Sequence, residues 1–263
     1  MAGGLYLRRR HPGRAIHQNV TRLSPNLPQS GLILLRGASV PGENRVRAAP
    51  HTLSIFDDDL EGLRASVCEM GGRVETAVAD AIAALVQGDA ERARRVVAGD
   101  QKVDALAAGI ERTAVHLIAL RSPLADDLRD VLAAFKIAGL IARMGDCASN
   151  IARRTDQVGD CRGIAQLKSL AAMGDEVGAM VKAALDAFVR RDGAAAARVA
   201  AMDDAVDNYR ACISRGLIDH MGEDPRSITQ STHLMFAAQK LERIADHAVG
   251  IAEMVGFAVG ESE

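Results

Sequence analysis

The chain has 263 residues, of which 48% are hydrophobic but only 3% aromatic, and its formal net charge is −2. Because Ala, Leu, Val and Ile supply most of the apolar residues, this composition favours closely packed helices. No run of about 18 apolar residues occurs, so we expect no transmembrane helix. The four cysteines show no CxxC pair and no metal-site spacing, which is typical of reduced thiols in a cytosolic protein.

The beginning of the chain differs in charge from the rest. Residues 1–50 carry eight Arg and one Glu, a net charge of +7, whereas the remainder carries 24 basic and 33 acidic residues, a net charge of −9. Five of the seven prolines lie in this stretch, which has no helical period. We therefore predict that residues 1–51 are a disordered, basic, proline-rich extension. We favour an over-extended reading frame, with translation starting near Val40 or Val46, over a nucleic-acid-binding or membrane-binding arm or a secretory signal.

Six long helices are predicted after this extension, bounded by glycines, prolines and capping residues. They cover residues 57–87, 89–120, 122–156, 165–191, 194–220 and 224–256. The pairs Ser122-Pro123 and Asp224-Pro225 each read as an N-cap followed by Pro at the first helical position. Because the breaks recur at matching points, we predict an all-α fold of two tandem three-helix bundles related by internal duplication. The bundles are assigned to residues 52–158 and 159–263.

The internal duplication is clearest in one repeated motif. Residues 141–148 read Ile-Ala-Arg-Met-Gly-Asp-Cys-Ala, and 100 positions later residues 241–248 read Leu-Glu-Arg-Ile-Ala-Asp-His-Ala. Apolar residues recur on this last helix with the period of a core face, at Ala237, Leu241, Ile244, Ala248 and Ile251. At about 100° per residue, Glu242 and Asp246 lie roughly 160° from that stripe. We therefore expect an outward carboxylate ledge rather than a site inside the bundle.

Acidic pairs also occur on the second helix of each half, spaced four residues apart and repeated after 103 residues. If the second and third helices of a half are neighbours, their carboxylates converge and repel unless a cation intervenes. Oxygen-only ligands suit Mg²⁺, Ca²⁺, Mn²⁺ or ferric iron, with Zn²⁺ less favoured. The predicted ligands are Asp203, Asp207, Glu242 and Asp246 in the second half, and Asp100, Asp104 and Asp146 in the first. The first set is smaller because Ala142 stands where the second half has Glu242.

Other interpretations of these residues stay open. Acidic pairs are frequent in charged helices and usually face solvent or pair with Arg and Lys, as we expect for Asp126 and Asp130. His247 is interpreted as a semi-buried packing or hydrogen-bonding residue rather than a ligand, and Cys147 as a small apolar filler. Arg143 and Arg243 either pair with acids of an adjacent helix or contact a partner protein. No Glu-x-x-His occurs, which disfavours a ferritin-like di-iron enzyme.

Several segments together resemble the PhoU family, accessory proteins of the bacterial phosphate-specific transport system. In chain order these segments are residues 56–63, Met70-Gly-Gly, Asp100-Gln-Lys-Val-Asp104, residues 120–129 and Leu241-Glu-Arg-Ile-Ala-Asp-His247. The resemblance covers residues 52–257 and implies two three-helix bundles with pseudo-twofold symmetry. It also implies surface metal clusters (Fe, Zn, Mg or Mn) on the acidic motifs, carried here by the seven carboxylates named above, with Ala142 and Cys147 departing from the usual Glu and His.

The resemblance further implies a regulatory role. PhoU-like proteins restrain the phosphate-starvation response when phosphate is plentiful, and link the ATP-binding subunit of the phosphate ABC transporter to a sensor histidine kinase. We accordingly expect a non-enzymatic cytoplasmic adaptor, peripheral to the inner membrane through its partners, that forms a homodimer or larger oligomer. The acidic body is not expected to bind nucleic acid. The alternatives are a metal-binding bundle with a storage or enzymatic role, and a plain scaffold whose acidic pairs are empty.

Overall fold

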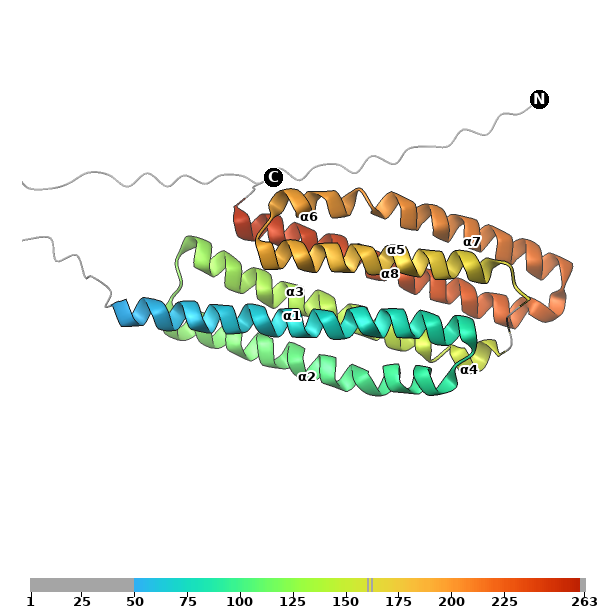
Figure 1. The fold of residues 1–263 in the computed structure, drawn as a ribbon, viewed down its shortest axis with the longest axis horizontal. Coiled ribbons are helices and arrows are strands. Elements are labelled where there is room, and N and C mark those ends of the chain that lie inside the picture. The colour runs from blue at the N-terminus through green and yellow to red at the C-terminus, as the bar shows by residue number, and fades with distance from the viewer. Residues whose placement is uncertain (1–49, 160, 162, 261–263) are drawn as a thin grey trace, which may run out of the picture. The chain divides into compact units, whose positions relative to one another are not determined.

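The structure is a computed structural model that describes residues 50–159, 161 and 163–260. These residues fall within one compact unit, and they form helices and no strand (Figure 1). The expected extension 1–51, except its last two residues, lies outside the described part, as do Val40 and Val46. None of the helices in the described ranges has both the length and the apolar character needed to cross a membrane.

The helices follow one another in two similar series. The first half contains α1 (Pro50–Gln87), α2 (Ala90–Arg121), α3 (Ala125–Ala152) and the short α4 (Thr155–Val158). The second half contains α5 (Gln166–Arg190), α6 (Gly193–Ala200), α7 (Asp203–Glu223), the 3₁₀ turn η1 (Pro225–Ser227) and α8 (Ile228–Val259). Equivalent caps begin the second helix of each half: the side chains of Asp89 and Asp192 accept hydrogen bonds from the backbone N–H of Arg92 and Ala195.

Each half packs as a three-helix bundle. Helices α1, α2 and α3 contact one another, and so do α5, α8 and the pair α6 and α7. The halves meet where α1 packs on α5 and α3 packs on α8, so these four helices form a central layer with α2 on one side and α6 and α7 on the other (Figure 1). The predicted all-α fold of two duplicated three-helix bundles is confirmed.

Apolar stripes on the central helices form the core. Ala237, Leu241, Ile244, Ala248 and Ile251 on α8 are all buried, and so are their counterparts Ile137, Ile141, Met144, Ala148 and Ile151 on α3. The period of about 3.6 residues therefore identified the packed face of both helices correctly.

Two glycines allow α1 and α5 to approach closely across the boundary between the halves. A Cβ on Gly71 of α1 would lie 2.6 Å from Leu185, and a Cβ on Gly174 of α5 would lie 2.3 Å from Ile82. Gly71 and Gly174 are 103 residues apart and each follows a buried Met, so the duplication also repeats this contact.

The expected start of the third helix is wrong. Ser122 does not cap α3; it ends α2 in the left-handed region (φ 47°) and donates its backbone N–H to the carbonyl of Ile118. The residue that precedes α3 is Leu124, whose carbonyl accepts the N–H of Asp127. Residues 122–124 connect the two helices, because the last turn of α2 is completed before the chain reverses direction into α3.

Other helix boundaries also differ from expectation. Asp224 caps the 3₁₀ turn η1, and α8 begins only at Ile228. The helix expected over 194–220 is interrupted, since i→i+3 backbone bonds between Val199 and Ala205 separate α6 from α7 and leave Asp203 in the first turn of α7. The helix expected to reach residue 156 ends at Ala152, and α4 follows it. Helix α1 begins at Pro50 rather than at residue 57.

A buried ionic cluster joins the two halves at one end of the central layer. Asp130 on α3 is only 6% exposed, and its Oδ2 lies 2.5 Å from the guanidinium of Arg64 on α1. The same oxygen also accepts a hydrogen bond from Arg191, which follows α5. Asp130 is thus neither solvated nor on a metal-binding face, but fixed between helices of both halves.

Candidate functional site

The structure brings the four predicted carboxylates of the second half into one electrostatic cluster at the α7–α8 contact. Asp203 and Asp207 come from α7, and Glu242 and Asp246 come from α8. Burial, followed by the charges of Asp246 and Asp207, raises the pKa of Asp203 above its ordinary value. Burial also raises the pKa of Glu242, and the charges of Asp207, Asp246 and Asp203 act in the same direction.

Arg210 is a member of this cluster that sequence reasoning missed. Its Nε lies 2.8 Å from Oε1 of Glu242, although this atom makes no hydrogen bond of good geometry. The guanidinium opposes the rise in the pKa of Glu242 but does not outweigh burial. Arg210 follows Asp207 by three positions on one helix face, so its spacing was a signal that could have been used.

The three predicted carboxylates of the first half also lie within electrostatic reach of one another. Burial raises the pKa of Asp100 on α2, and the charges of Asp146 on α3 and Asp104 on α2 add to the rise. A hydrogen bond from the Ser149 hydroxyl and the charge of Arg153 partly offset it. Ser149 is buried and was not identified from the sequence, because a lone Ser on an apolar helix carries no motif.

Close approach of α2 to α3 depends on Gly145. A Cβ at this position would lie 3.3 Å from both Oδ1 of Asp100 and Cγ1 of Val103, so a larger residue would press on the acidic side chain. The equivalent residue of the second half is Ala245, which is fully buried. The two acidic clusters therefore have the same location but different packing beneath them.

The donor chemistry of both clusters fits a hard cation, since the carboxylates are partly desolvated and mutually repulsive. Their positions do not form a ready coordination sphere, because no group of three or more His, Cys, Asp or Glu side chains in the described ranges could hold a metal ion as placed. In the second half Arg210 lies against Glu242, and in the first half Ser149 is bound to Asp100. A cation would have to displace these partners.

The remaining candidate residues lie along the α3–α8 contact. His247 is half-buried, and burial together with the charge of Arg143 lowers its pKa, while Asp246 acts in the opposite direction. Burial raises the pKa of the Cys147 thiol. Neither Arg143 nor Arg243 forms an ion pair with another described residue, so pairing with acids of an adjacent helix, one of the two expectations for them, is wrong.

Comparison with known proteins identifies the family. The sequence model of the PhoU domain matches residues 67–155 and 170–255. The phosphate-specific transport system accessory protein PhoU homolog of Zymomonas mobilis is 47% identical over 79% of this chain and 88% of its own length. The homolog of Caulobacter vibrioides is 43% identical over 79% of this chain and 90% of its own.

Solved structures agree with the sequence comparison. PhoU from Pseudomonas aeruginosa superposes with a TM-score of 0.74 at 36% identity, covering 79% of this chain and 100% of that one. The phosphate transport system regulatory protein PhoU from Streptococcus pneumoniae also gives a TM-score of 0.74, at 28% identity, covering 79% of this chain and 98% of that one. The resemblance stated from the sequence is confirmed, and the chain belongs to the PhoU family.

Proposed function

We propose that this protein is a non-catalytic adaptor that negatively regulates phosphate uptake and the phosphate-starvation response. In this role it links the ATP-binding subunit of the phosphate ABC transporter to a sensor histidine kinase at the cytoplasmic side of the membrane, and it works as a homodimer. Family membership over both halves supports a role in phosphate transport. The names of the similar proteins from Zymomonas mobilis and Streptococcus pneumoniae include accessory and regulatory functions.

Exposed apolar side chains near both helix turns carry the adaptor proposal. Leu120 and Leu124, at the turn between α2 and α3, are 66% and 79% exposed. Ile218 and Ile228, near the turn between α7 and α8, are 58% and 49% exposed. Grouped exposed apolar residues of this size are typical of protein contact sites. A protein that links two partners needs two such surfaces, and the two turns are candidates for them.

The proposal is tested in a bacterial strain that lacks the gene and carries a reporter for a phosphate-starvation promoter. We expect the reporter to stay on in high phosphate without the gene, and to be repressed when the full chain is restored. A strain without the gene that still represses normally would contradict the adaptor role.

Substitutions at the two turns then test the contact surfaces. We expect the double variants Leu120→Asp/Leu124→Asp and Ile218→Asp/Ile228→Asp each to lose repression while remaining folded, because charge on an exposed apolar contact weakens docking. The matched control is Leu120→Met/Leu124→Met, which keeps the apolar surface and should repress normally.

A further inference from the structure

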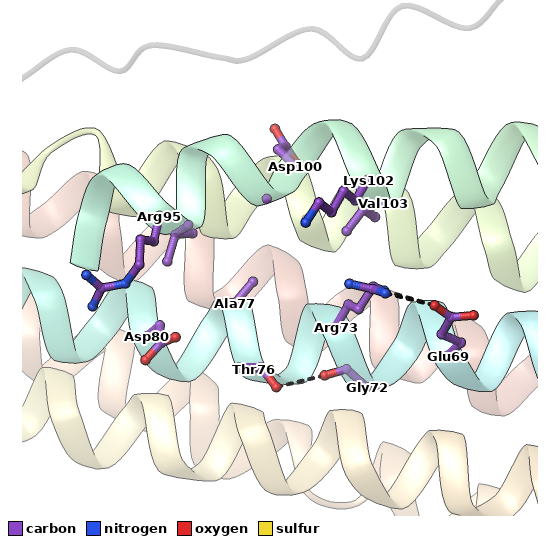
Figure 2. Close-up of a pocket in the computed structure, with 13 residues that line it drawn as sticks. Glu69, Gly72, Arg73, Thr76, Ala77, Asp80, Arg95, Asp100, Lys102 and Val103 are labelled. Atoms are coloured by element: carbon purple, nitrogen blue, oxygen red, sulfur yellow. Dashed lines mark hydrogen bonds and ion pairs between the residues drawn. The ribbon is translucent and has the colours of Figure 1, made fainter. Parts of the chain in front are cut away.

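A groove lies between α1 and α2 and reaches the first acidic cluster at Asp100 and Gly145 (Figure 2). Its volume is about 560 Å³, within the range of about 300–1,000 Å³ that is usual for small-molecule sites. The charged residues that line it are Glu69, Arg73, Asp80, Arg95, Asp100 and Lys102. The balance between these charges decides which ligand the groove accepts.

The acidic side chains of the groove are compensated or directed elsewhere. Glu69 forms an ion pair with Arg73 at 2.9 Å, and Asp80 lies 3.8 Å from the guanidinium of Arg92. Asp100 points away from α1 in Figure 2 and accepts its hydrogen bond from α3. Because these acidic side chains are paired or point elsewhere, they do not prevent an anion from binding in the groove.

Two cations of the groove are not held in ion pairs in the described part of the chain, although the charge of Arg95 adds to the backbone hydrogen bond and the charge of Arg92 in lowering the pKa of Asp89. Arg95 and Lys102 both reach from α2 toward α1 (Figure 2), and neither forms an ion pair within 4.0 Å. They are seven residues apart, or about 10.5 Å along the helix axis. Because both side chains are long, a ligand that carries two neighbouring anionic groups can engage both of them.

The floor of the groove is apolar and its walls lack side chains at two places. Ala77, Val96 and Val103 line the floor. Gly72 on α1 and Gly99 on α2 face open space, since a Cβ on either would meet nothing within 4 Å. An apolar or aromatic part of a ligand can therefore lie between the helices, next to the charged groups.

The equivalent surface of the second half has lost these features. At the positions of Arg73, Arg95, Gly99 and Lys102 it carries Glu176, Arg198, Met202 and Ala205. Only one of the three cations is kept, and a Met side chain stands where the first half has an open glycine. The second half keeps a groove of about 440 Å³ between α5 and α6, lined by Arg198, Val199 and Met202. The duplication thus offers an internal comparison in which the groove is present twice but the set of cations is complete only in the first half.

We propose that the α1–α2 groove binds a small phosphate compound of the nucleoside diphosphate class. Arg95 and Lys102 contact its two phosphate groups, because both side chains donate charge-assisted hydrogen bonds to phosphate oxygens. The apolar floor formed by Val96 and Val103 contacts its ring. This binding site is independent of the adaptor role, so loss of either proposal leaves the other standing.

Calorimetric titration of the full chain with ADP, in buffer free of divalent cations, tests the site. We expect Arg95→Glu and Lys102→Glu each to weaken ADP binding by about ten-fold or more. The matched control is Arg198→Glu in the second half, which should leave the affinity unchanged. Absence of ADP binding, or an equal loss in the control, would overturn the proposal.

The variant Gly99→Met separates ligand binding from folding. It places the residue of the second half into the groove, where it should block ADP. Because Gly99 lies in a helix and its Cβ would be unobstructed, the substitution should also raise Tm. A structural defect would lower both quantities, so loss of binding together with a higher Tm supports a bound ligand.

Further probes identify which part of the ligand is bound. Pyrophosphate should compete with ADP but bind more weakly, and adenosine should bind more weakly still, because it lacks the charges that Arg95 and Lys102 require. Binding should weaken as salt is added. If poly-glutamate competes with ADP and pyrophosphate does not, the groove docks an acidic protein segment and the proposal is wrong.

Discussion

Single side chains in the acidic clusters are held in unfavourable surroundings. Burial raises the pKa of Asp100, Asp203 and Glu242, and neighbouring carboxylates add to each rise. The partners that moderate this effect, Ser149 for Asp100 and Arg210 for Glu242, were not identified from the sequence. Both belong to the other helix of the contact. The spacing of Arg210 from Asp207 marks it as a neighbour of an acid on its own helix, but its pairing with Glu242 and the action of Ser149 on Asp100 depend on tertiary packing.

The raised pKa of Asp100 predicts how stability depends on pH. The folded protein favours the protonated form, so this contribution to stability is present below the ordinary Asp pKa of 3.8 and is lost as pH rises through the higher folded value. At neutral pH the charged carboxylate therefore destabilises the fold. We expect Asp100→Asn, in the presence of a chelator, to increase the free energy of unfolding at pH 7 by about 0.5 kcal/mol.

The measurement is urea denaturation of the parent and the variant at pH 7 and at about pH 3.5, below the ordinary carboxylate pKa. The difference between the two proteins should disappear at the lower pH, where Asp100 is protonated and resembles Asn. Asp219→Asn, an exposed carboxylate on α7 outside the cluster, serves as the control and should change little. A gain from Asp100→Asn that persists unchanged at low pH would contradict the assigned cause.

At the scale of helices, glycines and prolines in the sequence marked most of the breaks, although Ser122-Pro123 did not begin α3. Gly88 and Gly193 marked helix breaks correctly, and the structure shows that Asp89 and Asp192 beside them cap the helices that follow. The interruption between α6 and α7 falls at Ala201 and Met202, which are ordinary helix formers, and arises from local i→i+3 hydrogen bonds. Asp130 looked like one of many acidic residues on a solvated helix, because its two arginine partners lie 66 and 61 positions away.

The two helix contacts that carry acidic clusters are expected to differ in cation binding. The α7–α8 contact supplies four carboxylates, whereas α2–α3 supplies three because Ala142 replaces the acid. Asp203 and Asp207 also lie near the N-terminal end of α7, where the helix dipole favours negative charge and so offsets part of the gain from a cation. We expect the charge number to dominate and the α7–α8 cluster to bind more metal.

Metal content by mass spectrometry, on protein purified without an affinity tag, checks this expectation. Bound metal should fall in Glu242→Ala/Asp246→Ala, and it should rise in Ala142→Glu, which restores the fourth carboxylate of the first half. An equal metal content in parent and double variant would show that the second cluster holds no cation, and would favour the use of its acids in partner contacts.

At the scale of the whole described unit, two kinds of contact hold the halves together. Apolar packing of α1 on α5 and of α3 on α8 is non-directional, and glycines at positions 71 and 174 bring α1 and α5 close. The cluster of Asp130 with Arg64 and Arg191 is directional and lies at one end only. This ionic cluster therefore fixes the relative position of the two halves at that end.

Removal of the Asp130 carboxylate should selectively weaken the contact between the two halves at the end where Asp130 lies. In Asp130→Asn two partly exposed guanidinium groups lose their shared anion, so we expect the free energy of unfolding to fall by about 1–3 kcal/mol. The amides near the start of α3 and the end of α5 should exchange hydrogen faster, while those near Gly174, on the far side of the boundary, should keep their protection. Uniform loss of protection over both halves would contradict a local role.

Substitutions of Arg191 separate the ion pair from the backbone around it. Arg191 adopts a left-handed conformation (φ 53°) that is unfavourable for any residue with a Cβ. Arg191→Ala loses the contact with Asp130 and keeps the strain, whereas Arg191→Gly loses the contact and relieves the strain. We therefore expect Arg191→Gly to be more stable than Arg191→Ala by about 1 kcal/mol, with equally fast exchange at the start of α3 in both, because that exchange depends on the missing charge. Slower exchange in the Gly variant would show that backbone strain, rather than the ionic contact, controls this end of the boundary.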